Sequence, residues 1–253
     1  FSVRLPEERT DEIGAMNSVF NQTIEKIEKL LKQIVEMEMV NKDIEFQALQ
    51  AQINPHFLYN SLSLINWKAI EYEQDDISRI TLELSNYYRT SLNKGKNTLM
   101  LEQEVSNVRS YIEIQQVMHD NSFDVDIDIS SDILKVESLN LILQPLVENA
   151  IDHGIDLLTD RRGVITIKGS RCPYVNKANE NIDIVCLSVA DNGVGMDENI
   201  CESFLTAESK GYGARNVNDR IRLFYGEEYH LEVKSIVGAG TTIMIKFPVR
   251  LME

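Results

Sequence analysis

The chain has 253 residues, enough for one large domain or two smaller ones, and 43% of them are hydrophobic, so it can bury a sizeable core. Its formal net charge of −15 argues against nucleic acid or an anionic membrane surface as a main partner, because both attract basic proteins. The three cysteines show no C-x-x-C spacing, and no apolar run approaches the ~18 residues of a membrane span. We therefore expect neither a zinc site nor a transmembrane helix within the chain.

The first segment carries a heptad repeat, with Glu and Lys between the predicted core positions. One core position holds Ile13, Phe20, Ile27, Ile34, Asn41 and Ala48, and the other holds Met16, Thr23, Leu30, Met37, Ile44 and Ala51. A repeat of this length predicts a coiled coil or helical bundle, most simply a dimeric one. The alternative is one long amphipathic helix packed within a single chain.

The repeat runs into the stretch Q52-I-N-P-H-F-L-Y-N60, where Pro55 predicts a kink because proline lacks a backbone donor. A second helix is predicted around residues 77–88, where apolar and tyrosine side chains share one face. Residues 93–96 contain a glycine and break the pattern, and a third helix is predicted over residues 102–118.

From residue 121 onward the periodicity becomes that of an α+β fold. Apolar residues alternate with aspartates over Phe123–Ile129, which predicts a strand with one exposed face. A helix is predicted over residues 139–151 and should stop at Gly154, and another near residues 215–225. Further strands are expected at residues 164–168, 182–190, 231–235 and 242–247. The result is a mixed sheet with helices on one face, separated from the helical part near Asn121.

Three polar stretches in this second half carry candidate chemistry. In E148-N-A-I-D-H153, Asn149 and His153 share a helix face, and Glu148 can reach the same edge. An asparagine oxygen is a suitable ligand for Mg²⁺, which keeps most of its waters. Taken alone, the stretch could equally be the polar side of an amphipathic helix.

The second stretch is D191-N-G-V-G-M196, directly after an apolar strand. The Asp191 carboxylate can accept a hydrogen bond from an exocyclic amine such as that of adenine. Gly193 and Gly195 would allow a ring to approach the backbone closely. Taken alone, Asp-Asn-Gly is also common in hairpin turns.

The third stretch is K210-G-Y-G-A-R-N216 before a helix, where Gly211 and Gly213 would present free amides to phosphate oxygens. A final G238-A-G-T-T242 opens the last strand, and the hydroxyls of Thr241 and Thr242 could hydrogen-bond adenine, directly or through water.

The order and spacing of these motifs resemble the GHKL ATPase fold, the Bergerat α/β sandwich shared by histidine kinases, type II topoisomerases, Hsp90 chaperones and mismatch-repair ATPases. The resemblance covers roughly residues 137–249, and no P-loop motif is present. It implies an ATP site with Mg²⁺ on Asn149, adenine on Asp191 beside Gly193 and Gly195, phosphates on Gly211 and Gly213, and a mobile lid over residues 197–210.

The stretches Q50-A-Q-I-N-P-H-F-L-Y-N-S-L62 and L143-Q-P-L-V-E-N-A-I-D-H-G154 resemble the LytS/YesM-type sensor histidine kinases. D11-E-I-G14, with Phe20 and Asn21, resembles the second helix of a HAMP linker. The resemblance implies a HAMP helix and signalling coiled coil over residues 1–40, dimerisation and phosphotransfer helices over 41–120, and an ATP-binding domain over 121–253. It also implies the cytoplasmic part of a bacterial membrane protein, whose spans would precede the chain.

The same resemblance implies a homodimer that phosphorylates His56 from Mg-ATP and passes the phosphoryl group to an aspartate of a response-regulator receiver domain. Phe57, not an acidic residue, follows His56, so Glu148 becomes the candidate base across the domain cleft. Asn60 shares a helix face with His56 and is a candidate for a phosphatase role. The family usually has an aliphatic pair around the second glycine of its phosphate loop, whereas Tyr212 and Ala214 flank Gly213 here.

Two other classes of function stay open at this point. The first is an ATP-driven conformational switch of the chaperone or topoisomerase type, which hydrolyses ATP to solvent. The second is a dimeric scaffold whose ATP domain only relays conformation. His153 is expected to hydrogen-bond near the phosphates rather than to accept one.

Overall fold

The computed structural model describes residues 13, 15–17, 19–27, 55–91, 97–175, 181–205 and 212–250. The chain divides into two compact units, Phe1–Asn54 and Pro55–Glu253. In the first unit, residues 19–27 are helical, and the predicted core residues Met16 and Phe20 are exposed in the single chain. The rest of the heptad region and the residues before Pro55 lie outside the described ones, so the coiled coil and the kink stay predictions. Of the helices that are described, none has the length and apolar character needed to cross a bilayer.

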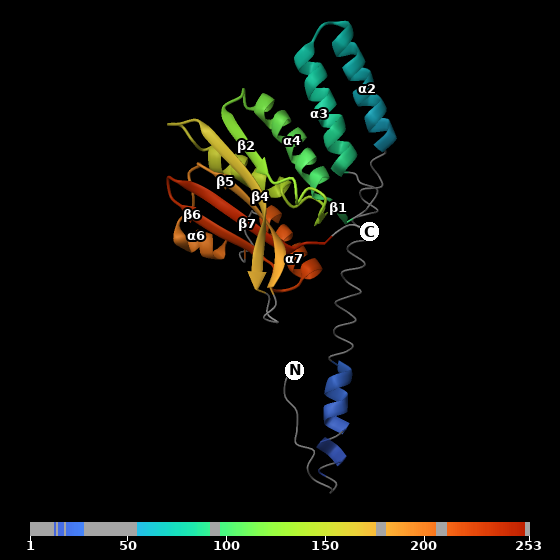
Figure 1. The fold of residues 1–253 in the computed structure, drawn as a ribbon, viewed down its shortest axis with the longest axis vertical. Helices are drawn as coiled ribbons and strands as arrows, with labels where there is room; N and C mark the ends of the chain where they lie inside the picture. The colour runs from blue at the N-terminus through green and yellow to red at the C-terminus, as the bar shows by residue number, and fades with distance from the viewer. Residues whose placement is uncertain are drawn as a thin grey trace. The chain divides into compact units, whose positions relative to one another are not determined.

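The second unit begins with a helical hairpin of α2 (Pro55–Glu71) and α3 (Asp75–Ser91), which lie side by side in Figure 1. The Tyr59 hydroxyl donates to the Tyr88 carbonyl at 3.3 Å, and the Ser78 hydroxyl donates to Asn66 Oδ1 at 2.7 Å. The first contact pairs the start of α2 with the end of α3, and the second pairs the later part of α2 with the start of α3, so the two helices are antiparallel. The helix predicted around residues 77–88 is confirmed, whereas the predicted break at 93–96 lies outside the described residues.

Helix α4 (Leu101–Met118) confirms the third predicted helix and joins the hairpin to the sheet. It follows β1 (Thr98–Met100), which pairs antiparallel with β3 (Glu137–Leu139). Val105, Val108 and Ile112 of α4 are buried in the same cluster as the residues of the main sheet. Helix α4 is therefore part of the core of the second half.

The main sheet has five strands, and it is mixed as predicted. It consists of β2 (Phe123–Ile129), β4 (Gly163–Val175), β5 (Asn181–Asp191), β7 (Gly240–Pro248) and β6 (Leu231–Ile236), in that spatial order. Among the described strands of this sheet, only β2 and β4 run parallel. A parallel pair needs a crossover, and the chain between these strands supplies β3, α5 (Gln144–Asn149) and the π-helix η1 (Ala150–Ile155).

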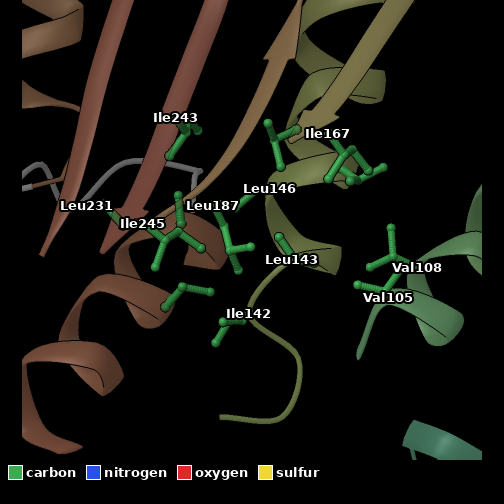
Figure 2. Packing of buried hydrophobic residues seen from close by; sticks show 14 of the residues in the cluster. Val105, Val108, Ile142, Leu143, Leu146, Ile167, Leu187, Leu231, Ile243 and Ile245 are labelled. Carbon is green, nitrogen blue, oxygen red and sulfur yellow. The ribbon is translucent and has the colours of Figure 1, made fainter. Parts of the chain in front are cut away.

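The core lies between one face of this sheet and the helical layer, as the alternation of apolar residues requires. Figure 2 shows Leu187, Ile243 and Ile245 of the sheet packed with Leu143 and Leu146 beside α5. The layer is completed by α4 and by α7 (Tyr212–Tyr225), which contributes buried side chains from Ala214, Val217 and Ile221. A short helix, α6 (Glu198–Ser203), lies within the segment predicted as a lid. The predicted α+β sandwich is therefore confirmed.

The helix predicted over residues 139–151 is wrong at its start. Leu139 ends strand β3, and α5 begins only at Gln144. The spacing of Leu139, Ile142 and Leu143 imitates a helix, but Leu141 adopts a positive φ of 57°, which a helix does not allow. The loop is held instead by hydrogen bonds from its own backbone amides to the buried Glu104 carboxylate.

Two predicted ends also differ from the structure. Gly154 does not stop the helix, because η1 continues through it to Ile155. A Cβ at residue 154 would lie 2.9 Å from Asp191 Oδ1, so this glycine allows close packing instead of ending the helix. Helix α7 begins at Tyr212, which places Gly213 in its first turn and not in a preceding loop.

Candidate functional site

One pocket gathers most of the predicted ligand-binding residues. It measures about 420 Å³, its open mouth included, and lies between α5, η1 and strands β5 and β7. Its lining consists of Leu146, Asn149, Ala150, His153, Gly154, Val189, Asp191, Gly195, Met196, Phe204, Thr241 and Ile243. The fold thus brings Asn149, His153, Asp191, Gly195 and Thr241 to one place, although they are far apart in the sequence.

The other predicted site residues that the structure describes lie outside the lining of this pocket. Thr242 and Gly193 are not among the described residues that line the pocket, and Gly193 packs directly against Gly154. Gly211 lies outside the described residues. His56 and Asn60 lie on α2, where Asn60 Nδ2 is 3.4 Å from His56 Nδ1, so the two share a helix face as predicted.

Asp191 ends β5 and projects into the pocket with its carboxylate partly desolvated. Its Oδ1 accepts hydrogen bonds from the backbone amides of Gly193 at 2.8 Å and Thr241 at 3.2 Å. Burial raises the pKa of Asp191 above its ordinary value, while these two amide bonds act in the opposite direction. The amides of Gly193 and Thr241 both bond to Oδ1, and these two bonds fix the orientation of the carboxylate.

Two glycines allow the backbone to close around Asp191. A Cβ on Gly193 would lie 2.4 Å from the carbonyl carbon of Gly154, which no real side chain tolerates. Gly195 has φ +68°, and a Cβ there would lie 2.0 Å from the carbonyl oxygen of Ile236. The residue types at these positions are therefore required by the local backbone, whatever ligand the pocket binds.

The pocket has an apolar wall and a polar edge. Leu146, Val189 and Ile243 are buried core residues that form the wall, together with Met196 and Phe204. An apolar wall with a few fixed polar groups is typical of a site for a flat heterocycle.

Asn149 is placed at the end of α5 with its amide turned inward. Its Nδ2 is buried and has no hydrogen-bond partner among the residues that the structure describes, and a Cβ on Gly213 would lie 3.9 Å from that nitrogen. A buried amide atom without a partner is costly, so it indicates a group that completes its bonding when a ligand is present. A half-turn of the amide exchanges its oxygen and nitrogen, so either end can face such a ligand.

Sequence reasoning missed two residues that shape the pocket. Ser235 Oγ accepts from the Met196 amide at 2.7 Å and lies 2.9 Å from Thr241 Oγ1, so it joins the two glycine-rich loops. Arg161 donates to the carbonyl oxygens of Asn192 at 2.7 Å, Gly193 at 3.1 Å and Gly238 at 2.8 Å. A serine in a strand and an arginine in a turn carry no local signal of such a role.

Glu148 faces away from the pocket, towards the helical hairpin. Its Oε1 accepts from Gln144 Nε2 at 2.7 Å, and the same nitrogen donates to the Tyr87 hydroxyl of α3 at 2.7 Å. Glu148 is therefore on the side of α5 that contacts the hairpin, whereas Asn149 is on the side that lines the pocket.

The loop before α5 is held by a buried carboxylate. Glu104 of α4 is fully buried and accepts from the backbone amides of Leu141, Ile142 and Leu143 at 2.9, 2.7 and 2.9 Å. Burial raises the pKa of Glu104, against the effect of the three amides and of the nearby Arg220. This contact sets the start of the helix that presents Glu148 and Asn149.

Comparison with known families first defines the class of the second half. Residues 135–251 match the family described as "Histidine kinase-, DNA gyrase B-, and HSP90-like ATPase", in agreement with the mixed sheet and the position of the pocket. This half is therefore an ATP-binding domain of the GHKL class.

The first half makes the assignment more specific, since residues 44–123 match the family described as "Histidine kinase". The chain belongs to the histidine kinases, and its resemblance to the LytS/YesM type is confirmed by its relatives. It is 36% identical to sensor histidine kinase YesM of Bacillus subtilis over 98% of this chain and 41% of that protein. It is 31% identical to sensor protein LytS of Oceanobacillus iheyensis over 92% of this chain and 38% of that one.

The chain thus spans about two fifths of the length of these relatives. Among solved structures, a histidine kinase domain from Erythrobacter litoralis, part of a blue-light activated histidine kinase, superposes with a TM-score of 0.45 at 18% identity. That match covers 83% of this chain and 94% of the other.

Proposed function

We propose that this chain is the catalytic part of a two-component sensor kinase, which phosphorylates its own His56 from Mg-ATP and passes the phosphoryl group to an aspartate of a response-regulator receiver domain. The observation that carries the proposal is the convergence of Asn149, His153, Asp191 and Thr241 on one pocket with an apolar wall. The matches to histidine kinase and ATPase families over residues 44–123 and 135–251 support it.

In this proposal the adenine ring lies against the apolar wall, and its amine donates to Asp191 Oδ2. An imidazole nitrogen of His56 attacks the γ-phosphorus, the bond from that phosphorus to the bridging oxygen breaks, and ADP leaves. The proton released from the ring goes to Glu148, which acts as the base. Phosphoryl transfer needs mainly in-line positioning and charge neutralisation, so residues that place these groups determine the rate.

The residues present fit a magnesium ion. Asn149 offers a hard amide oxygen when its amide is turned, and its buried Nδ2 has no hydrogen-bond partner among the described residues, which indicates that the amide is completed only with a ligand. Within the described part of the chain, no group of three His, Cys, Asp or Glu residues could hold a metal, so an ion here would depend on Asn149, water and phosphate oxygens. When bound, the ion would neutralise phosphate charge.

The proposal extends to the organisation of the chain. Residues 1–40 would form the HAMP-derived helix and signalling coiled coil, 41–120 the dimerisation and phosphotransfer helices, and 121–253 the ATP-binding domain. Helix α4 lies in the second of these segments but contributes Val105, Val108 and Ile112 to the core of the third. A homodimer is supported by large apolar side chains that α2 exposes in the single chain, among them Phe57, Leu64, Trp67 and Ile70. The HAMP-like segment suggests that the kinase works at the cytoplasmic side of a membrane, held there by spans outside this chain.

Asn60 is proposed to have a second role, in dephosphorylation. Its Nδ2 lies 3.4 Å from His56 Nδ1, on the same face of α2, where it can orient a water molecule towards a phosphorylated group. Asn60→Ala should then slow the loss of phosphate from the cognate regulator. Unchanged dephosphorylation would contradict this role.

The experiment that tests the main proposal is incubation with γ-labelled ATP and Mg²⁺. Wild type should acquire an acid-labile, base-stable label, and both His56→Gln and Asn149→Ala should acquire none. His230→Gln changes an exposed histidine that is not among the described residues lining the pocket, so it is the matched control and should label normally. Label that survives in His56→Gln would contradict the phosphoacceptor assignment.

The same assay separates the two other classes of function. An ATP-driven switch of the chaperone or topoisomerase type would release phosphate to solvent without labelling the protein. A scaffold would bind nucleotide and neither release phosphate nor become labelled.

A further inference from the structure

We propose that Gln144 is a positioning residue for the phosphotransfer reaction: it holds the Glu148 carboxylate and, through the Tyr87 hydroxyl, ties it to the helical hairpin that carries His56. The inference rests on the proposed function and deepens it, because it concerns how the candidate base is oriented. Neither Gln144 nor Tyr87 contacts the nucleotide pocket, since neither is among the described residues that line it.

One nitrogen atom of Gln144 donates two hydrogen bonds. Gln144 Nε2 donates to Glu148 Oε1 and to the Tyr87 hydroxyl, each at 2.7 Å. An amide nitrogen has two hydrogens, so both bonds can form at once. An ionised carboxylate only accepts, and the reversed amide would place two acceptors together, so the nitrogen must face Glu148.

The contact between Gln144 and Glu148 is largely shielded from solvent. Gln144 is buried with 8% of its surface exposed, and Glu148 is half-buried one turn later on α5. The ring of Tyr111 on α4 lies 6.1 Å from that of Tyr87. Burial, and next the negative charge of Glu148, raise the pKa of Tyr111. Glu148 is also close to the aromatic side chains because it shares Gln144 Nε2 with the Tyr87 hydroxyl. Hydrogen bonds in such surroundings are stronger than in water.

The hydrogen bond between Gln144 and Tyr87 can also be located relative to His56, the proposed phosphoacceptor. Tyr87 lies near the end of α3, and the adjacent Tyr88 carbonyl accepts from the Tyr59 hydroxyl of α2 at 3.3 Å. Tyr59 follows His56 by three residues, which is less than one helical turn. The bond between Gln144 and Tyr87 therefore joins α5 to the end of the hairpin at which His56 lies.

These three observations give one residue two functions. Gln144 selects one orientation of Glu148, and it couples that orientation to the position of the hairpin. When the amide is lost, Glu148 can adopt other rotamers, while Asp191, Asn149 and the apolar wall of the pocket keep their places. The effect should fall on the rate of transfer and not on ATP binding.

The test is a comparison of single-turnover rates of His56 labelling, with ATP affinity measured separately by calorimetry. Gln144→Leu should slow transfer by about tenfold to a hundredfold, the equivalent of a lost hydrogen bond to a charged group, with KM and Kd for ATP unchanged. Tyr87→Phe removes one anchor of the amide and should slow transfer by about two- to tenfold. Tyr88→Phe is the matched control, because it removes a neighbouring hydroxyl and keeps both the ring and the carbonyl that Tyr59 binds.

A double-mutant comparison shows whether Gln144 acts through Glu148. In a Glu148→Gln background, Gln144→Leu should have little further effect on the residual rate. Thermal unfolding is recorded for every variant, and if Gln144→Leu lowers stability, Tyr87→Phe decides, since it removes a single oxygen.

Three results would overturn the positioning role alone, given normal labelling of wild type. These are wild-type rates in both Gln144→Leu and Tyr87→Phe, a loss confined to KM, or an undiminished effect of Gln144→Leu in the Glu148→Gln background. An unlabelled wild type would overturn the proposed function, and this inference with it.

Discussion

Asp191→Asn is the substitution with the most specific expected result, because the structure dictates how the new amide must turn. Asp191 Oδ1 accepts from the amides of Gly193 and Thr241 at 2.8 and 3.2 Å. An amide nitrogen placed there would face two donors, so the asparagine oxygen must take the Oδ1 position. The new NH₂ group then occupies the Oδ2 position and points towards the adenine amine, where two donors face each other.

The expected magnitude follows from this geometry. A hydrogen bond to a charged acceptor contributes about 1.5–3 kcal/mol, so its loss should raise the Kd for ATP roughly 10- to 150-fold. Both backbone bonds to the Oδ1 position survive, and the pocket loses no volume. The thermal stability of the unliganded protein should therefore change little.

The assay is calorimetric titration with two nucleotides, ATP and purine riboside triphosphate, which lacks the exocyclic amine. Wild type should prefer ATP, and Asp191→Asn should lose most of that preference. Thr242→Val is a matched control at a neighbouring polar residue that does not line the pocket in the described structure, and it should retain the preference. ATP affinity within twofold of wild type in Asp191→Asn, or an intact preference for ATP, would refute the placement of adenine on this carboxylate.

The pH dependence provides an independent check of the same contact. Burial raises the pKa of Asp191 above its ordinary value of 3.8. In the unliganded protein, this carboxyl contributes stability that is full below 3.8 and is lost as the pH rises through the folded-state pKa. ATP binding should have the opposite sign, because in the proposed complex the adenine amine donates to the ionised form. ATP affinity should therefore fall as the pH is lowered through the raised pKa, and this fall should be absent in Asp191→Asn.

Three further predictions concern the residues that shape the site. Gly193→Ala should destabilise the fold by at least about 1–3 kcal/mol in denaturant unfolding, since its Cβ would meet the Gly154 backbone at 2.4 Å. In the control Gly238→Ala, the new Cβ meets nothing within 4 Å, so the loss should be only about 1 kcal/mol of backbone strain. Equal losses in the two variants would contradict this packing. Glu104→Ala should lower the free energy of unfolding by about 2–4 kcal/mol, because three backbone amides lose the buried carboxylate that accepts their hydrogen bonds. A loss below about 1 kcal/mol would show that water replaces the carboxylate. Arg161→Lys should weaken ATP binding by about two- to tenfold, as one ammonium cannot span three carbonyl oxygens, and calorimetry should show unchanged affinity if the loops hold without it.

Much of the fold was predictable because its signals are local. The alternation in Phe123–Ile129 specified a strand with one exposed face, and β2 has that burial pattern. The helical spacing after Asp75 and Glu102 specified α3 and α4. The α+β class followed from the order of these elements, since a sheet with one apolar face needs a helical layer to cover it.

The errors arose where distant residues override a local pattern. Leu139, Ile142 and Leu143 have helical spacing. Glu104, more than thirty residues earlier, accepts hydrogen bonds from the amides of this loop and thereby keeps the loop out of the helix. Gly154 looks like a helix stop, and it is present instead because Asp191 packs against it. Neither contact is indicated by the residues that flank it in the sequence.

The same distinction applies to the site. Sequence alone indicated Asn149, His153, Asp191 and Gly195, because an amide on a helix and a carboxylate followed by glycines have recognisable chemistry. Their convergence on one pocket was decided by the tertiary structure, which brings α5 and η1 against the ends of β5 and β7.

Arg161, Ser235 and Gln144 could not be found from sequence at all. Each acts by bonding to backbone or side chains far along the chain, so its role exists only after the sheet and helices have packed. The sequence alone therefore determined the class of protein, and it predicted the polar residues that line the pocket. The tertiary structure decided how those groups are held and that Glu148 faces the hairpin, because hydrogen bonds between distant segments depend on the packed geometry and not on local pattern.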